Sequence, residues 1–170
     1  MKKLFALSVI MIAFAASAFS QATATATATI VTPITITKTG TDLSFGNIIP
    51  STTVAGTVQV ATDGTPTYTD VTASGSPTAT AAVTAAVFTV TGTPDATYDI
   101  TLPSGNVVLS GPGTNTMNAH NFVSDPNGTG QLSNPAGTET LRVGATLDVA
   151  ANQAAGTYTS APFTVTVNYN

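Results

Sequence analysis

The most constraining feature of this sequence is a strict alternation with a period of two, clearest in residues 21–38, QATATATATIVTPITITK. The even positions from 22 to 36 carry alanine, isoleucine and a single threonine, whereas the odd positions carry mostly threonine. Successive side chains of a strand point to opposite faces, so the pattern predicts one apolar and one polar face. Fifteen residues would span about 50 Å, more than twice the length of a typical strand. We therefore expect the run to be divided between two strands.

Pro33 supplies the point of division, because proline cannot donate a hydrogen bond to a β-ladder. We expect Ile34 and Ile36 to belong to the first strand of the folded domain, leaving residues 22–30 free to pair elsewhere. The side chains on the apolar face of this candidate assembly strand are those of Ala22, Ala24, Ala26, Ala28 and Ile30. Four alanine methyls bury little apolar area, so backbone hydrogen bonds would carry much of the pairing. A tail, or an overlong first strand wrapping its own domain, would produce the same sequence.

The rest of the chain alternates short period-two runs with turn clusters rich in glycine, proline, aspartate and asparagine. In TLRVGATLDV the residues expected to face inward are Leu141, Val143, Ala145, Leu147 and Val149. After the first twenty residues, no window of helical length carries an apolar period of 3.6 residues. Many short strands with this punctuation predict an all-β fold, most simply an antiparallel β-sandwich that is immunoglobulin-like in the broad sense. A closed barrel is the second expectation.

Residues 1–20, MKKLFALSVIMIAFAASAFS, have the layout of a secretory signal peptide, with two lysines, an apolar stretch and small residues. Cleavage is expected after Ser20, with Ala18 as the second choice. The apolar stretch is shorter than the roughly 20 residues of a membrane-spanning helix. We therefore expect an exported chain located in the periplasm, on the cell surface or outside the cell, with no transmembrane span. Its length suits an N-terminal extension, residues 21–33, followed by a single domain, residues 34–170.

Charge and composition exclude several classes of partner. Once the signal peptide is removed, only Lys38 and Arg142 remain against eight acidic residues, a formal net charge of −6. Nucleic-acid binding requires a basic surface, so no nucleic-acid partner is expected. Cysteine is absent, which rules out a disulfide framework. Thirty-five threonines favour strands and give a surface with few charges, which suits a protein that packs against copies of itself.

Residues suited to catalysis or metal binding are sparse. His120 is the only histidine, and one imidazole without cysteine neither builds a zinc site by itself nor completes a serine triad unaided. The carboxylates are scattered and tryptophan is absent, which disfavours a glycosidase. DPNGTGQ, residues 125–131, resembles the start of a calcium loop, but Ala136 stands where the bidentate glutamate is needed. We expect a turn there, and no enzyme activity, cofactor or metal.

Three stretches carry a family resemblance: LSFGNIIP near the start, FTVTGTPDATYDITLP in the middle and AGTYTSAPFTVTVNYN at the end. In these stretches the chain resembles a family of small secreted bacterial β-proteins of unknown function, itself related to the spore coat protein U domain and to subunits of archaic chaperone–usher pili. The resemblance covers residues 26–170 and implies a pilin-like β-sandwich that assembles into surface fibres or coats. It also implies a periplasmic chaperone and an outer-membrane exporter as partners. Such subunits often carry a cysteine pair, which this chain lacks.

The leading functional hypothesis is a non-enzymatic structural subunit of an extracellular or cell-surface fibre or coat. Residues 22–30 of one copy would complete an open sheet of another copy, or of a related surface subunit, with alternate side chains entering its core. The alternative is a monomeric secreted binding or adhesion module on a similar sandwich, which would expose an aromatic or acidic patch. A hydrolase is the least expected function.

Overall fold

Alternating β-branched and polar residues make every regular element of the described chain a strand, and none of the described residues is helical. The computed structural model describes residues 21–74 and 81–170. All strand pairs are antiparallel, which confirms the predicted all-β, antiparallel class. The predicted signal peptide, residues 1–20, lies outside the described residues, as do residues 75–80. No helix of the described part is long and apolar enough to cross a membrane.

The chain divides into a segment that ends at Ile30 and a domain that begins at Val31. The strands of the domain, in chain order, are β1 (Thr35–Lys38), β2 (Ser44–Phe45), β3 (Ile48–Ile49), β4 (Gly56–Val60), β5 (Pro66–Thr69), β6 (Thr72–Ala73), β7 (Val83–Thr84), β8 (Ala86–Thr91), β9 (Thr97–Thr101), β10 (Val107–Ser110), β11 (Thr116–Asp125), β12 (Thr129–Gln131), β13 (Thr138–Val149), β14 (Thr159–Ser160) and β15 (Thr166–Tyr169).

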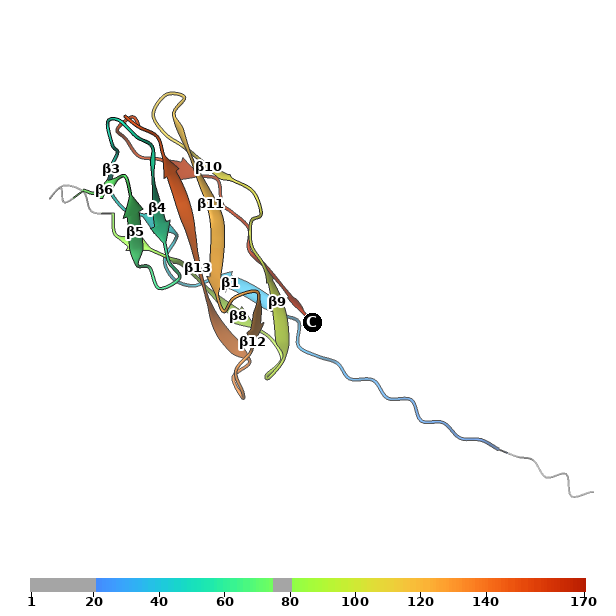
Figure 1. Cartoon of the computed structure of the whole chain (residues 1–170). Coiled ribbons are helices and arrows are strands. Elements are labelled where there is room, and N and C mark those ends of the chain that lie inside the picture. Colours follow the sequence, from blue (N-terminus) through green and yellow to red (C-terminus); the bar gives the residue numbers. More distant parts are fainter. Residues whose placement is uncertain (1–20, 75–80) are drawn as a thin grey trace, which may run out of the picture. The chain divides into compact units, whose positions relative to one another are not determined.

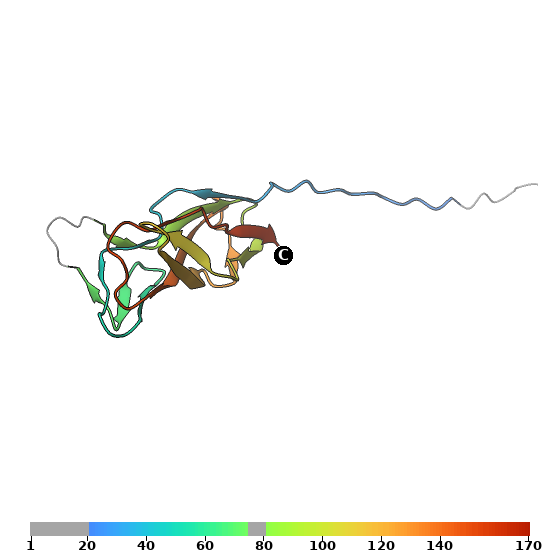
Figure 2. The same ribbon diagram turned by 90° about the horizontal axis from the view of Figure 1, so that it is seen from above.

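The main sheet has the strand order β1-β8-β13-β11-β10-β14, and β4 and β5 extend it from β13. This sheet curls like half of a barrel, as the two views of the domain show (Figures 1 and 2). A second sheet has the order β12-β9-β15, and β2-β7 and β3-β6 form two small pairs. Curling lets one long sheet contribute side chains to both core clusters described below.

The long strand β13 changes partner halfway along. Its residues from Thr138 to Val143 pair with β8, and those from Ala145 to Val149 pair with β4. Gly144 lies between the two ladders, where a Cβ would come within 2.1 Å of the Val60 carbonyl oxygen. Only glycine permits this close approach of two backbones, so Gly144 is the point at which β4 replaces β8.

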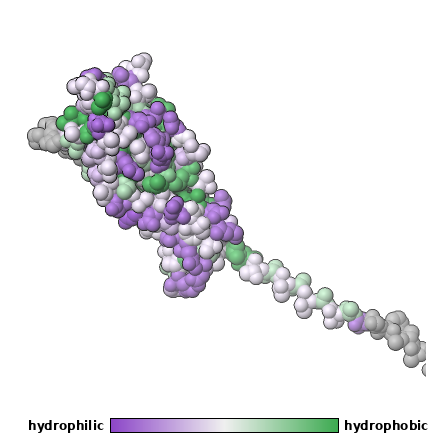
Figure 3. All heavy atoms as spheres, viewed as in Figure 1, coloured by the Kyte–Doolittle hydropathy of each residue, from purple (hydrophilic) through white to green (hydrophobic). Residues whose placement is uncertain are grey.

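The surface of the domain is largely neutral and hydrophilic. White and purple residues cover most of the face in Figure 3, while green residues gather in a band across its middle and near the end that carries β3 and β6. The larger hydrophobic side chains exposed on the domain are those of Val31, Ile49, Val54, Val108 and Val123.

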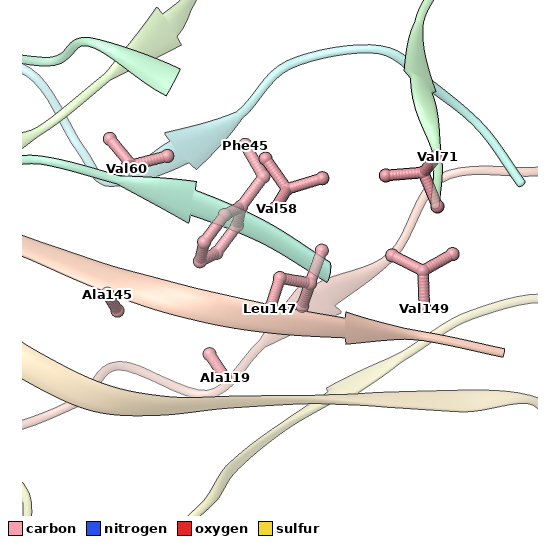
Figure 4. Close-up of a cluster of buried hydrophobic side chains, with 8 residues drawn as sticks. All are labelled: Phe45, Val58, Val60, Val71, Ala119, Ala145, Leu147 and Val149. Carbon is pink, nitrogen blue, oxygen red and sulfur yellow. The ribbon is translucent and has the colours of Figure 1, made fainter. Parts of the chain in front are cut away.

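The core consists of two clusters, which we name after the strands that cover them. The β4-side core comprises Phe45, Val58, Val60, Val71, Ala119, Ala145, Leu147 and Val149. Figure 4 shows the side chains of this cluster gathered between β4, β13 and β11. The β9-side core comprises Ala86, Val90, Tyr98, Leu132, Leu141, Val143, Val165 and Val167. All five β13 residues predicted to face inward are buried in these two clusters, which confirms that part of the pattern.

Strand β11 contains a bulge that explains its irregular sequence, MNAHNFVSD. The pairing with β13 shifts between His120 and Val123, and Asn121 adopts a φ of +49°. One extra residue changes the phase of the alternation, so both Ala119 and Phe122 face the core. The Phe122 ring then contacts the ring of Phe163 at a centroid distance of 5.2 Å. The bulge thereby joins β11 to the segment that leads into β15.

Candidate functional site

The candidate assembly strand is unpaired in this chain. Residues 21–30 contain no strand, and every one of their side chains is exposed. The five residues predicted to form its apolar face, Ala22, Ala24, Ala26, Ala28 and Ile30, are therefore solvent-accessible, and Ile30 is 98% exposed. Whether this segment pairs with another molecule remains a prediction.

The start of the domain is fastened by a small hydrogen-bonded group at Thr32. The Tyr169 hydroxyl donates to the Thr32 carbonyl oxygen and accepts the Thr93 N–H, each at 2.7 Å. The Thr32 N–H donates to Thr93 Oγ1 at 3.1 Å. Gly92 leaves room for this arrangement, since a Cβ there would lie 2.2 Å from the Tyr169 hydroxyl oxygen. The chain is thus held at a fixed point just after the unpaired segment ends.

Sequence reasoning missed this anchor. The alternation of the last eight residues places Tyr169 on the core face, and its ring does pack against the β9-side core. No local pattern, however, links its hydroxyl to a residue 137 positions earlier. The only signal in the sequence is that Tyr169 follows one phenylalanine and two valines on the inward face. A tyrosine hydroxyl that is partly buried needs a hydrogen-bond partner.

Next to this anchor, two strands of the domain have unpaired edges. Strands β1 and β15 lie close together at the end of the domain that carries the C-terminus (Figures 1 and 2). Among the described residues, β1 pairs only with β8, and β15 pairs only with β9. Each strand therefore turns one row of backbone N–H and C=O groups away from its own sheet. We call the region between these two edges the β1–β15 seam.

The β9-side core is less completely covered along the seam. Val90, Tyr98, Leu141 and Val143 are fully buried in its interior. On the segment at the seam, by contrast, Val165 and Val167 retain 8% and 9% exposure. The residues at its margin that are only partly buried include Ile34, Ile36, Phe163 and Tyr169. The seam thus combines free backbone groups with an incompletely covered apolar layer, the two features that an added strand needs.

The outward residues on both sides of the seam are polar and small. Thr35 and Thr37 on β1 are exposed, as are Thr166 and Asn168 on β15. Both edges therefore show an apolar inner face and a mainly threonine outer face. Residues 22–30 show the same division.

Besides the Lys38–Asp42 ion pair on the surface, two pairs of ionisable side chains connect strands of the described domain. His120 Nε2 lies 2.9 Å from Asp148 Oδ1 across β11 and β13, and this hydrogen bond raises the pKa of His120. The buried Tyr98 hydroxyl donates to Glu139 Oε2 at 2.7 Å, and burial together with this carboxylate raises the pKa of Tyr98. The same Glu139 oxygen accepts the Gln131 N–H. The first pair links the paired strands β11 and β13, and the second links β9 to β13, which belong to different sheets.

The segment with a calcium-loop resemblance forms the connection between β11 and β12. Gly128 there has a φ of +72°, and the Thr129 N–H donates to the Asn127 carbonyl oxygen at 2.8 Å. Nowhere in residues 21–74 and 81–170 do three histidine, cysteine or acidic side chains come close enough to hold a metal ion. The backbone of this connection is that of a tight turn.

Tyr158 ties its loop to the main sheet through hydrogen bonds. Its hydroxyl donates to the Ala154 carbonyl oxygen and accepts from Gln153 Nε2, both at 2.8 Å. Gln153 Nε2 also donates to the Thr116 carbonyl oxygen on β11. The tyrosine therefore acts through Gln153 to hold the loop after β13 against the sheet.

Comparison with known proteins gives one positive result. No curated protein and no solved structure matches the chain significantly. A family model described as a domain of unknown function (DUF4402) matches residues 34–169, which is most of the chain. The expected resemblance to a family of unknown function is thus confirmed at that level. The chain belongs to the DUF4402 family.

Proposed function

We propose that this protein is a non-enzymatic structural subunit of an extracellular or cell-surface fibre or coat. In this proposal residues 22–30 of one copy pair with the free edge of β15 in the β1–β15 seam of the next copy. The observation that carries it is the coexistence of an unpaired alternating segment and an unpaired, partly uncovered sheet edge in one chain.

The matching patterns of segment and seam support this pairing. A strand inserted beside β15 with its alanines and Ile30 inward would place Thr23, Thr25, Thr27 and Thr29 outward. Its outer face would then continue the threonine face of β1 and β15. A one-residue slip would turn the threonine hydroxyls into the apolar layer and the alanines to water. The alternation therefore favours the register in which the alanines and Ile30 face the core and the threonines face water.

The small size of alanine makes this a backbone-dominated interaction. Each alanine methyl contributes about 0.8 kcal/mol on burial, so the main apolar contribution comes from Ile30. Ladder hydrogen bonds contribute a net of about 1 kcal/mol each. The free energy of each junction is therefore modest. Pairing of this kind suits an assembly of many copies, in which the free energies of many junctions add up.

The proposal includes a pilin-like, immunoglobulin-like sandwich related to the spore coat protein U domain. Support comes from the two sheets that enclose the β9-side core and from a last strand, β15, with a free edge. Export by the signal peptide, residues 1–20, followed by handling by a periplasmic chaperone and an outer-membrane exporter, belongs to the same proposal. Related surface subunits are the other expected partners.

The second candidate, a monomeric binding or adhesion module, is favoured by a separate observation. The outer face of β4, β5, β11 and β13 carries a hollow whose lining includes the carboxylates Asp70 and Asp148. A hollow with carboxylates at its rim is the kind of surface that the alternative hypothesis requires. The two candidates are compatible, since a fibre subunit can also bind a ligand.

The proposed assembly is tested by comparing residues 21–170 with residues 31–170 by size-exclusion chromatography with light scattering and by negative-stain electron microscopy. The longer chain should form rods or ladders, and the shorter one should remain monomeric. A matched pair of variants locates the effect on one face of the strand. Ala26→Asp with Ala28→Asp should abolish assembly, whereas Thr25→Asp with Thr27→Asp should preserve it. Equal behaviour of the two double variants would contradict the proposal.

A further inference from the structure

A hollow of about 440 Å³ opens on the outer face of the main sheet, away from the seam. It lies where β4 and β11 begin and β5 and β13 end, and the loop after β13 borders it through Gln153. Its volume is within the range of small-molecule binding sites. Met117 and Val149 also line it, and apolar atoms make up the larger part of its surface.

Four of the polar side chains that line the hollow form one row across the sheet. Asn118 pairs with Asp148, Asp148 with Thr57, and Thr57 with Thr69, on β11, β13, β4 and β5 in turn. Adjacent strands are about 4.8 Å apart, so the row presents an amide, a carboxylate and two hydroxyls at regular intervals. The opposite faces of these strands supply Val58 and Leu147 to the β4-side core. The row is therefore supported by a packed layer.

The polar groups of the hollow are largely free to bind a ligand. Within the described residues, the side chains of Thr57, Thr69, Asp70 and Asn118 have no hydrogen-bond partner. Asp148 uses one oxygen, Oδ1, to hold His120 Nε2, which orients the carboxylate. Asp70 has a φ of +55°, an unusual conformation for a residue other than glycine. Such conformations are often found at binding sites.

The types of free group define the ligand. Two carboxylates repel an anion, so a phosphate or sulfate group is excluded. An ammonium group offers only donors and would leave the hydroxyls and the amide N–H groups without an acceptor. Sugar hydroxyls both donate and accept, and the planar carboxylate and amide groups can each engage two neighbouring hydroxyls. We propose that the hollow binds one or two rings of a neutral saccharide, independently of the assembly proposed above.

The expected affinity is low. Among the described residues that line the hollow there is no aromatic side chain on which a sugar ring could stack. The binding would rest on hydrogen bonds in competition with water, and we expect a Kd of about 1 mM. A low affinity per subunit becomes useful when many subunits act together, as repeated sites gain avidity.

The test is a titration of residues 31–170, which contain the whole hollow and should remain monomeric, with a panel of neutral sugars, followed by the backbone amide signals in NMR spectra. The panel consists of the methyl glycosides of glucose, galactose and mannose, N-acetylglucosamine, and maltose. At least one should cause saturable shifts at Thr57, Thr69, Asn118 and Asp148. Cyclohexylammonium chloride and inorganic phosphate, used as separate arms, should not compete with it.

Two variants and a control assign the binding to the row. Asp148→Asn and Asn118→Ala should each weaken the sugar's affinity at least tenfold, while the amide spectrum away from the hollow stays unchanged. Thr101→Ala, on the outer face of the other sheet, should leave the affinity unaltered. Absence of saturable shifts with every neutral sugar would overturn the proposal, as would shifts that persist in Asp148→Asn or that arise only with the ammonium ion.

Discussion

At the scale of single residues, the hydrogen bonds that matter most join parts of the chain that are far apart in sequence. Tyr169, near the end of the chain, holds Thr32 at the beginning of the domain, and Thr93 bonds to both. Tyr98 and Glu139 connect β9 to β13 in the same manner. A period-two pattern identifies which side chains face inward, but it carries no information about these partners.

The anchor at Thr32 can be tested with Tyr169→Phe. This change removes two hydrogen bonds of 2.7 Å while keeping the ring that packs against the β9-side core. We expect the free energy of unfolding, measured with urea, to fall by about 1–2 kcal/mol. The matched control is Tyr68→Phe, because Tyr68 is also partly buried and its hydroxyl has no partner within the described residues. Equal losses in the two variants would contradict the role assigned to the Tyr169 hydroxyl.

At the scale of elements, the sequence predicts a strand when its alternation is long and regular. It does not predict short strands, whose existence depends on the neighbouring strands they pair with. The twelve-residue strand β13 follows its alternation from end to end, because one face is buried along its whole length. The two-residue strands β2, β3, β6, β7 and β14 have no such pattern, since their few bonds depend on what lies beside them. The sequence of β11 is irregular, but it does not identify the bulge. Asn121 is the inserted residue, and no glycine or proline marks its position.

The change of partner along β13 provides a test at this scale. Gly144→Ala would bring a methyl group against the Val60 carbonyl oxygen and the backbone of Ala61. Neither backbone can move without disturbing a ladder, so we expect a loss of about 1–3 kcal/mol in the free energy of unfolding. Gly105→Ala is the control, since a Cβ there meets no atom within 4 Å. It should change the stability by less than about 0.5 kcal/mol. A Gly144→Ala protein as stable as this control would show that β4 and β8 do not converge at this point.

At the scale of the whole molecule, the question is why one chain keeps both an unpaired strand pattern and an unpaired edge. The alternation of residues 22–30 could be predicted from the sequence, since it depends on the local order of letters alone. The seam could not, because it depends on the contact between β1 and β15, which are far apart in sequence and belong to different sheets. The hollow could not be predicted either, because its row of polar side chains comes from four strands whose register no local pattern specifies.

The relation between segment and seam can be measured without relying on polymer formation. A synthetic peptide of residues 21–30, added to residues 31–170, should raise the thermal midpoint of unfolding by an amount that grows with peptide concentration, because it binds only the folded domain. A peptide with aspartate at positions 24, 26 and 28 should have no effect, since the charges would enter the apolar layer. A peptide with aspartate at positions 23, 25 and 27 carries the same charge on its outer face and should retain most of the effect. If the unmodified peptide did not raise the midpoint, or if the two aspartate peptides raised it equally, the β1–β15 seam would not accept this strand. The segment would then have to be explained as a tail, whatever the assembly state of the full chain.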